Sequence, residues 1–133
     1  MVMAKLLSSE GPYLEAVVEV HGQRLCVMDA LDEGPGAAPK AGEVFDLVFG
    51  ELLDDDDETW EQMFAANPEG RQCLVPLGGW RYRAYGRVVG VQPVVVDCGV
   101  LQVENVVHSK DPALVGATLA FTIARLDARV AVA

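Results

Sequence analysis

The chain has 133 residues, of which 51% are hydrophobic and 23% charged, a composition typical of a globular protein that excludes a disordered chain. This length predicts a single globular domain over residues 1–133, with enough core to fold without metals or disulfides. Twenty acidic residues against ten basic ones give a net charge of -10, which disfavours nucleic acid and anionic membranes and favours basic partners.

Two alternating segments predict a β-hairpin near the N-terminus. Apolar side chains recur at every second position in residues 13–20, and a second apolar segment occupies residues 24–31. The pair His21-Gly22 between them predicts a tight turn, because glycine readily adopts positive φ. Residues 32–42 are rich in Gly and Pro and predict a loop. Residues 43–53 are apolar on both faces and predict a central strand.

One segment has the spacing of an amphipathic helix. Trp60, Met63 and Phe64 stand at positions i, i+3 and i+4, and Thr59 with Gln62 matches a capping box. The Asn-Pro pair that follows should end the helix. We therefore predict one principal helix over about residues 59–66, with Trp60 and Phe64 packed against the core.

The rest of the chain is predicted to be almost entirely β. Strands are expected at residues 72–77, 80–91, 94–103 and 117–126, with Gly99 as a bulge or bend. The predicted fold is mostly β (α+β by count), a small antiparallel barrel with one principal short helix inserted after the third strand. This order of elements resembles that of the five-stranded OB-fold barrel.

An acidic run precedes the predicted helix and is the most unusual local feature. Its six carboxylates repel one another, so they must stay solvated or meet cations; they belong to Asp54, Asp55, Asp56, Asp57, Glu58 and Glu61. The pattern of a calcium-binding loop is absent. One interpretation is a docking surface for a basic protein partner. The other is a solvated helix start, where acidic residues are favoured by the helix dipole.

A second feature is a strand face that combines arginine with tyrosine. Arg81, Arg83, Tyr85 and Arg87 fall on one side of the predicted strand. Such a face could stack on and neutralise a single-stranded nucleic acid, which would suit an OB-like barrel. The net charge opposes this, because phosphate contacts dominate that kind of affinity. The alternative is that the arginines pair with the chain's own acidic residues.

The cysteines give no sign of a disulfide or a metal site. The chain has three cysteines: Cys26, Cys73 and Cys98. Because their number is odd and no two of them have C-x-x-C spacing, we expect reduced thiols and a cytoplasmic protein. Cys98 continues the buried phase of its strand and is expected to be buried. A thiol nucleophile would need a nearby base, so the candidate pairs are Cys26 with His21 and Cys98 with His108. The alternative is that the thiols are core residues and the imidazoles lie on the surface.

No nucleotide-binding, zinc-protease or serine-hydrolase motif occurs, so we predict no cofactor, no metal and no catalytic residue. No segment reaches the length of a membrane helix. We expect a non-catalytic acidic binding protein of the cytoplasm, such as an inhibitor or immunity-type partner of a basic protein. The alternatives are an OB-like single-stranded nucleic-acid-binding module and a small enzyme or ligand binder with an unrecognised site. The sequence does not indicate an oligomeric state.

Overall fold

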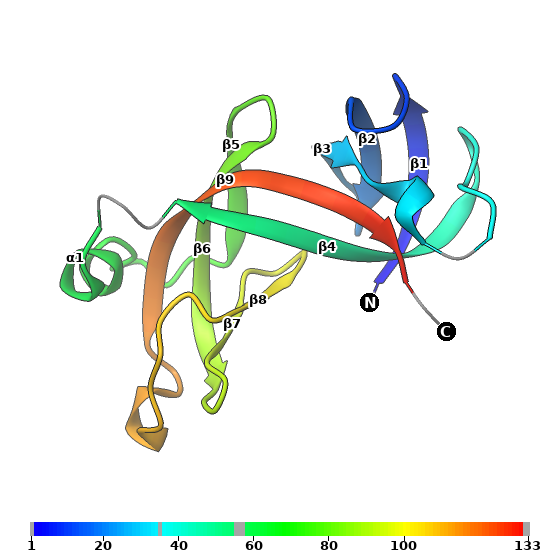
Figure 1. Cartoon of the computed structure of the whole chain (residues 1–133). Coiled ribbons are helices and arrows are strands. Elements are labelled where there is room, and N and C mark those ends of the chain that lie inside the picture. The colour runs from blue at the N-terminus through cyan, green and yellow to red at the C-terminus, as the bar shows by residue number, and fades with distance from the viewer. Residues whose placement is uncertain (1, 35, 55–57, 132–133) are drawn as a thin grey trace. The chain divides into compact units, whose positions relative to one another are not determined.

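The computed structural model describes residues 2–34, 36–54 and 58–131 (Figure 1). In this part the chain forms nine strands, one α-helix and two short 3-10 helices. The strands are β1 (Val2–Ser9), β2 (Glu15–Val20), β3 (Gln23–Asp29), β4 (Val44–Asp54), β5 (Cys73–Gly78), β6 (Arg81–Gly90), β7 (Val95–Asp97), β8 (Gln102–Glu104) and β9 (Thr118–Val130). The helices are α1 (Trp60–Ala65), η1 (Leu31–Glu33) and η2 (Pro112–Leu114).

The chain divides into two compact units, which are described separately below. The first unit contains Met1–Leu52, Gly78–Arg81 and Arg125–Ala133, and the second contains Leu53–Leu77 and Tyr82–Ala124. The long strands β4 and β9 contribute residues to both units. The prediction of one domain concerns independent folding and stays a prediction.

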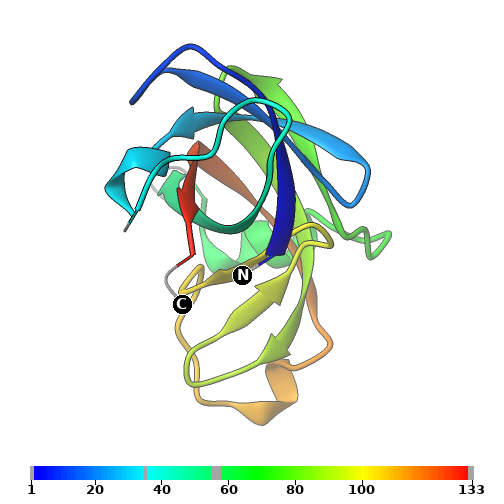
Figure 2. The same cartoon turned by 90° about the vertical axis from the view of Figure 1, so that its right-hand side faces the viewer.

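The first unit is a closed five-stranded β-barrel (Figures 1 and 2). β1 pairs antiparallel with β2 and with β4, and β2 pairs antiparallel with β3. β9 lies next to β4 and also pairs in parallel with β3, through Met28↔Asp127 and Asp29↔Ala128, which closes the ring. The predicted barrel is therefore confirmed, with one parallel pair at the point of closure.

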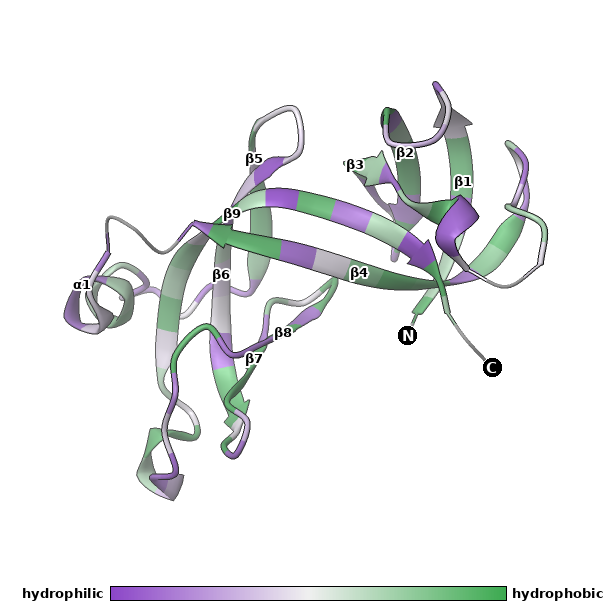
Figure 3. Cartoon of the chain, viewed as in Figure 1, coloured by the Kyte–Doolittle hydropathy of each residue, from purple (hydrophilic) through white to green (hydrophobic). Residues whose placement is uncertain are grey.

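The barrel interior follows the period-two pattern of its strands, as the apolar colouring in Figure 3 illustrates. Alternate side chains of each strand are buried: Ala4, Leu6, Ala16, Val18, Val20, Leu25, Val27, Phe45, Leu47, Leu126 and Ala128. The turn between β2 and β3 has φ of 50° at His21 and 79° at Gly22. Positive φ at both central residues is the geometry of a type I′ turn, so the predicted hairpin is confirmed.

The second unit is an antiparallel sheet with β6 at its centre. β6 pairs with β9 from Tyr82↔Ile123 to Arg87↔Thr118, and it also pairs with β5 and β7. β8 pairs antiparallel with β7, on the edge of β7 that faces away from β6. One face of the sheet is a buried core, built from Tyr82, Ala84, Val88, Leu119, Phe121 and Ile123.

Several predicted elements differ from the structure. The first strand, β1, was not predicted, so α1 follows the fourth strand rather than the third. The expected strand over residues 94–103 is two short strands, because Gly99, at φ 88°, lies in the turn between them. β4 is central as predicted, but its second face is open, since Val44 is 60% exposed. Leu14, expected on the core face, is 50% exposed and precedes β2.

Candidate docking surfaces

Helix α1 carries an exposed aromatic side chain at its first position. The helix begins at a capping box in which Thr59 Oγ1 accepts from Gln62 N at 3.2 Å and Gln62 Oε1 accepts from Thr59 N at 2.9 Å. Met63 is 5% exposed and Phe64 is half-buried, so these two side chains hold the helix to the second unit. Trp60 is 47% exposed. The prediction that Trp60 packs against the core is wrong, because its face of this short helix points to solvent.

The acidic run is already partly neutralised within the second unit. Glu58 receives two hydrogen bonds from the guanidinium of Arg83, at 2.5 and 2.9 Å, and Arg83 also donates to Thr122 Oγ1 at 3.1 Å. The bond to Glu58 holds the pKa of the Arg83 guanidinium above its usual value. Asp54 is half-buried and Glu61 is exposed. Asp55, Asp56 and Asp57 lie outside the described residues.

The arginine face is not an open platform in the second unit. Besides the pairing of Arg83 with Glu58, the guanidinium of Arg71 lies 4.8 Å from the centre of the Tyr85 ring. Arg87 is exposed, and its guanidinium lies next to Gly70: its Nη2 atom is 3.7 Å from the position that a Cβ atom would take there. Arg81, Arg83, Tyr85 and Arg87 alternate along β6 with the buried Tyr82, Ala84 and Gly86, so the four residues share the outer side of the strand as the spacing predicts. Two of them, Arg83 and Tyr85, already contact other side chains of the chain.

The loop after α1 is fastened to this sheet by a buried asparagine. Asn67 is 1% exposed, and its Nδ2 atom donates to Arg71 O at 2.9 Å and to Leu119 O at 3.1 Å. Its Oδ1 atom accepts from Arg71 N at 2.8 Å, and its backbone oxygen accepts from Thr118 Oγ1 at 2.9 Å. The Asn-Pro pair, predicted only to end the helix, thus also sets the position of α1 on β6 and β9.

The first unit presents a second exposed aromatic residue, which the sequence reasoning missed. Tyr13, in the loop between β1 and β2, is 55% exposed and has a φ of 64°. Its backbone is fixed by β3, since Tyr13 N donates to Asp29 O at 2.7 Å and Asp29 N donates to Leu14 O at 2.9 Å. The buried carboxylate of Asp29 accepts from Ser9 Oγ and from Leu31 N. These partners are far apart in sequence, so no local pattern indicated the loop.

The Tyr13 hydroxyl belongs to a chain of polar contacts across the first unit. It donates to Glu33 Oε1 at 3.0 Å, and Glu33 Oε2 lies 3.5 Å from Arg129 Nε. Arg129 Nε is also 3.7 Å from the carboxylate of Asp127, which is 3% exposed. Asp127 lies so close to Gly50 that a Cβ atom there would be 2.0 Å from Oδ1, so only glycine fits beside it. The bond to Glu33 raises the pKa of the Tyr13 phenol.

Two of the three thiols lie in environments that lower their reactivity. Cys26, Cys73 and Cys98 form no disulfide, and Cys98 is fully buried as predicted. Partial burial, with a smaller effect of Glu15, raises the pKa of the Cys26 thiol, which disfavours the nucleophilic thiolate. Among the described residues no group of three or more His, Cys, Asp or Glu side chains could hold a metal ion.

A shallow pocket of about 510 Å³ lies in the second unit. It is lined by Gln92, Pro93, Val94, His108, Ser109 and Lys110. Most of these side chains are exposed, and Val94 forms the buried floor. His108 and Cys98 do not line this pocket together, so the nucleophile–base pairing considered from the sequence finds no support there.

No family model, curated protein or solved structure matches the chain. In the part of the chain that the structure describes, no helix has the length and apolar character needed to cross a membrane. A functional proposal therefore depends on the chemistry of the exposed surfaces described above.

Proposed function

We propose that this chain is a non-catalytic acidic binding protein that docks a basic protein through the surface at the start of α1. The observation that carries the proposal is Trp60, which is 47% exposed at the edge of the acidic run. Tryptophan is the residue most often found to dominate binding energy at protein interfaces. A large apolar side chain left outside the core, with acidic residues beside it, fits an interface with an apolar centre and a charged rim.

The local structure supports this by holding Trp60 in place. The capping box fixes the first turn of the helix, Met63 anchors the turn below, and the Asn67 bonds fix the segment that follows. A side chain that is already positioned loses less conformational entropy when a partner binds. The pairing of Glu58 with Arg83 neutralises one carboxylate of the run, and Glu61, on the first turn of α1, is exposed.

The charge of the second unit agrees with a basic partner. It contains half of the chain's twenty acidic residues but only four of its ten basic ones. Such a field speeds the encounter with a positively charged protein and repels nucleic acid. An inhibitor or immunity-type role, and residence in the reducing cytoplasm with three free thiols, are parts of the same proposal.

An OB-like nucleic-acid-binding module is the second candidate, favoured by the barrel order β1-β2-β3-β9-β4 with its parallel closure. Its expected binding face is the weak point. Arg83 and Tyr85 are engaged by Glu58 and Arg71. A nucleic acid would have to displace both contacts against an overall charge of -10.

The fluorescence of Trp60 tests the proposal directly. In a Trp80→Phe background, Trp60 is the only tryptophan, and the probe is a synthetic peptide of alternating arginine and glycine. We expect the emission to change on titration at low salt, less so at high salt, and not with a glutamate–glycine peptide. Exchanging Glu61→Gln should weaken the response, whereas the control Glu104→Gln, an exposed acid on β8, should not. A Trp60 emission spectrum that does not change when the basic peptide is added would refute the docking surface.

A further inference from the structure

We infer that the loop of Tyr13 in the first unit is a recognition site for arginine, used by an arginine-rich segment of the basic partner. This inference rests on the proposed function, since it assumes a basic protein partner, and it assigns that partner a second point of contact. Every residue invoked belongs to the first unit, whereas α1 belongs to the second.

The backbone of the loop holds the side chain of Tyr13 outside the core. Its φ of 64° is unusual for an aromatic residue, and three contacts impose it. Tyr13 N donates to Asp29 O, Asp29 N donates to Leu14 O, and Glu10 N closes the loop by donating to Glu15 O at 2.9 Å. The strand ends thus force the ring outward, where it is 55% exposed beside Leu14 at 50%.

The Tyr13 ring is also tethered at its hydroxyl end. The hydroxyl donates to Glu33 on η1, and Glu33 is itself held by Arg129 on β9. The phenol is therefore attached at its far end as well as at its backbone. An aromatic ring that is 55% exposed and tethered at both ends can bind a guanidinium by stacking, at less entropic cost than an untethered ring.

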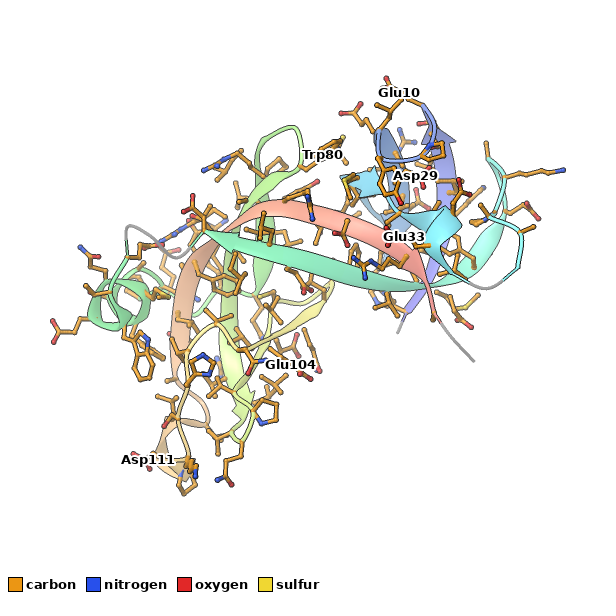
Figure 4. All side chains as sticks on the ribbon, viewed as in Figure 1. Glu10, Asp29, Glu33, Trp80, Glu104 and Asp111 are labelled. Atoms are coloured by element: carbon orange, nitrogen blue, oxygen red, sulfur yellow. The ribbon has the colours of Figure 1, made fainter. Side chains whose placement is uncertain are left out.

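The acidic residues near Tyr13 complement the positive charge of an arginine side chain. Two carboxylates of η1, Asp32 and Glu33, act on the Tyr13 hydroxyl, and Glu10 at the start of the loop adds a third acidic residue to the same end of the first unit (Figure 4 labels Glu10 and Glu33). Arg129 offsets only one of them, Glu33. An arginine side chain can stack its planar group on the ring and place its donors toward these carboxylates. A lysine ammonium cannot make the planar stack, so the site should prefer arginine.

The test compares two peptides on the intact chain. We measure binding of an arginine–glycine and a matched lysine–glycine peptide by calorimetry in a Trp60→Ala background, which removes the tryptophan of the α1 surface, and we follow the Tyr13 ring signals by NMR. We expect the ring signals to shift and the arginine peptide to bind about two- to fivefold more tightly, the size of an exposed cation–π contact. Equal affinities with unmoved ring signals would overturn the inference.

Two variants assign the effect to the ring. Tyr13→Asn should retain the fold, because asparagine tolerates positive φ, and should abolish the preference for arginine. Tyr13→Phe keeps the ring and should keep the preference. Preserved preference in Tyr13→Asn, with its thermal unfolding unchanged, would overturn the inference.

The Trp60 emission and the Tyr13 NMR signals test the α1 surface and the arginine site separately. A response of Trp60 without movement of the Tyr13 signals would remove the arginine site and leave the α1 surface standing. Movement of the Tyr13 signals with a silent Trp60 would support the arginine site and remove the α1 surface.

Discussion

Replacing the buried Asn67 by alanine should destabilise the second unit substantially. The side chain makes four hydrogen bonds: two with the backbone of Arg71 and one with Leu119 O, all of 2.8–3.1 Å, and a longer one of 3.4 Å with Gly86 O. Leu119 is fully buried, so its carbonyl would lose a partner at a cost of about 1–3 kcal/mol, and each bond with Arg71 contributes about 0.5–1.5 kcal/mol. The free energy of unfolding should therefore fall by about 4 kcal/mol.

Urea-induced unfolding, followed by circular dichroism and by tryptophan emission, measures this change. The control is Thr118→Val, which removes one hydrogen bond to the same residue, from Thr118 Oγ1 to Asn67 O. It should cost about 1 kcal/mol. A loss for Asn67→Ala no larger than that of the control would contradict the role assigned to the asparagine and would mean that water replaces its bonds.

Three further predictions concern single side chains. Met63→Ala should cost about 2–5 kcal/mol and Trp60→Ala about 1 kcal/mol or less, since only Met63 is buried; equal losses in urea unfolding would contradict this. Glu33→Gln should lower the pKa of the Tyr13 phenol, seen as ionisation at lower pH in an absorbance titration, and an unchanged midpoint would disprove the contact. Cys98 should react with a thiol reagent more slowly than Cys73, and equal rates would contradict its burial.

The sequence predicted those elements whose signals are local. The hairpin at His21-Gly22 and the capping box of α1 are encoded within a few residues, and both are present. Alternation in residues 117–126 identified the buried Leu119 and its neighbours on β9. Such patterns depend on which side chains share a face, and that follows from the backbone period alone.

The features that the sequence did not predict depend on distant partners. Closure of the barrel needs β3 and β9 to pair across about a hundred residues, which no local pattern encodes. Helical spacing predicted that Trp60 and Met63 share one buried face of α1. Of the two, only Met63 is buried in the second unit, and Trp60 is exposed. The display of Tyr13 likewise requires Asp29 and Glu33.

The most direct test of the docking surface is its effect on association kinetics. We would measure the association rate of the arginine–glycine peptide as a function of ionic strength for the parent chain and for a variant with Asp55, Asp56 and Asp57 changed to Asn. Charges at the rim of an interface act mainly on encounter, so the variant should associate more slowly and with a flatter salt dependence, while its unfolding is nearly unchanged. The control, Glu69→Gln with Glu104→Gln, should behave like the parent chain. Identical rates and salt slopes for the triple variant and the parent chain would contradict the account.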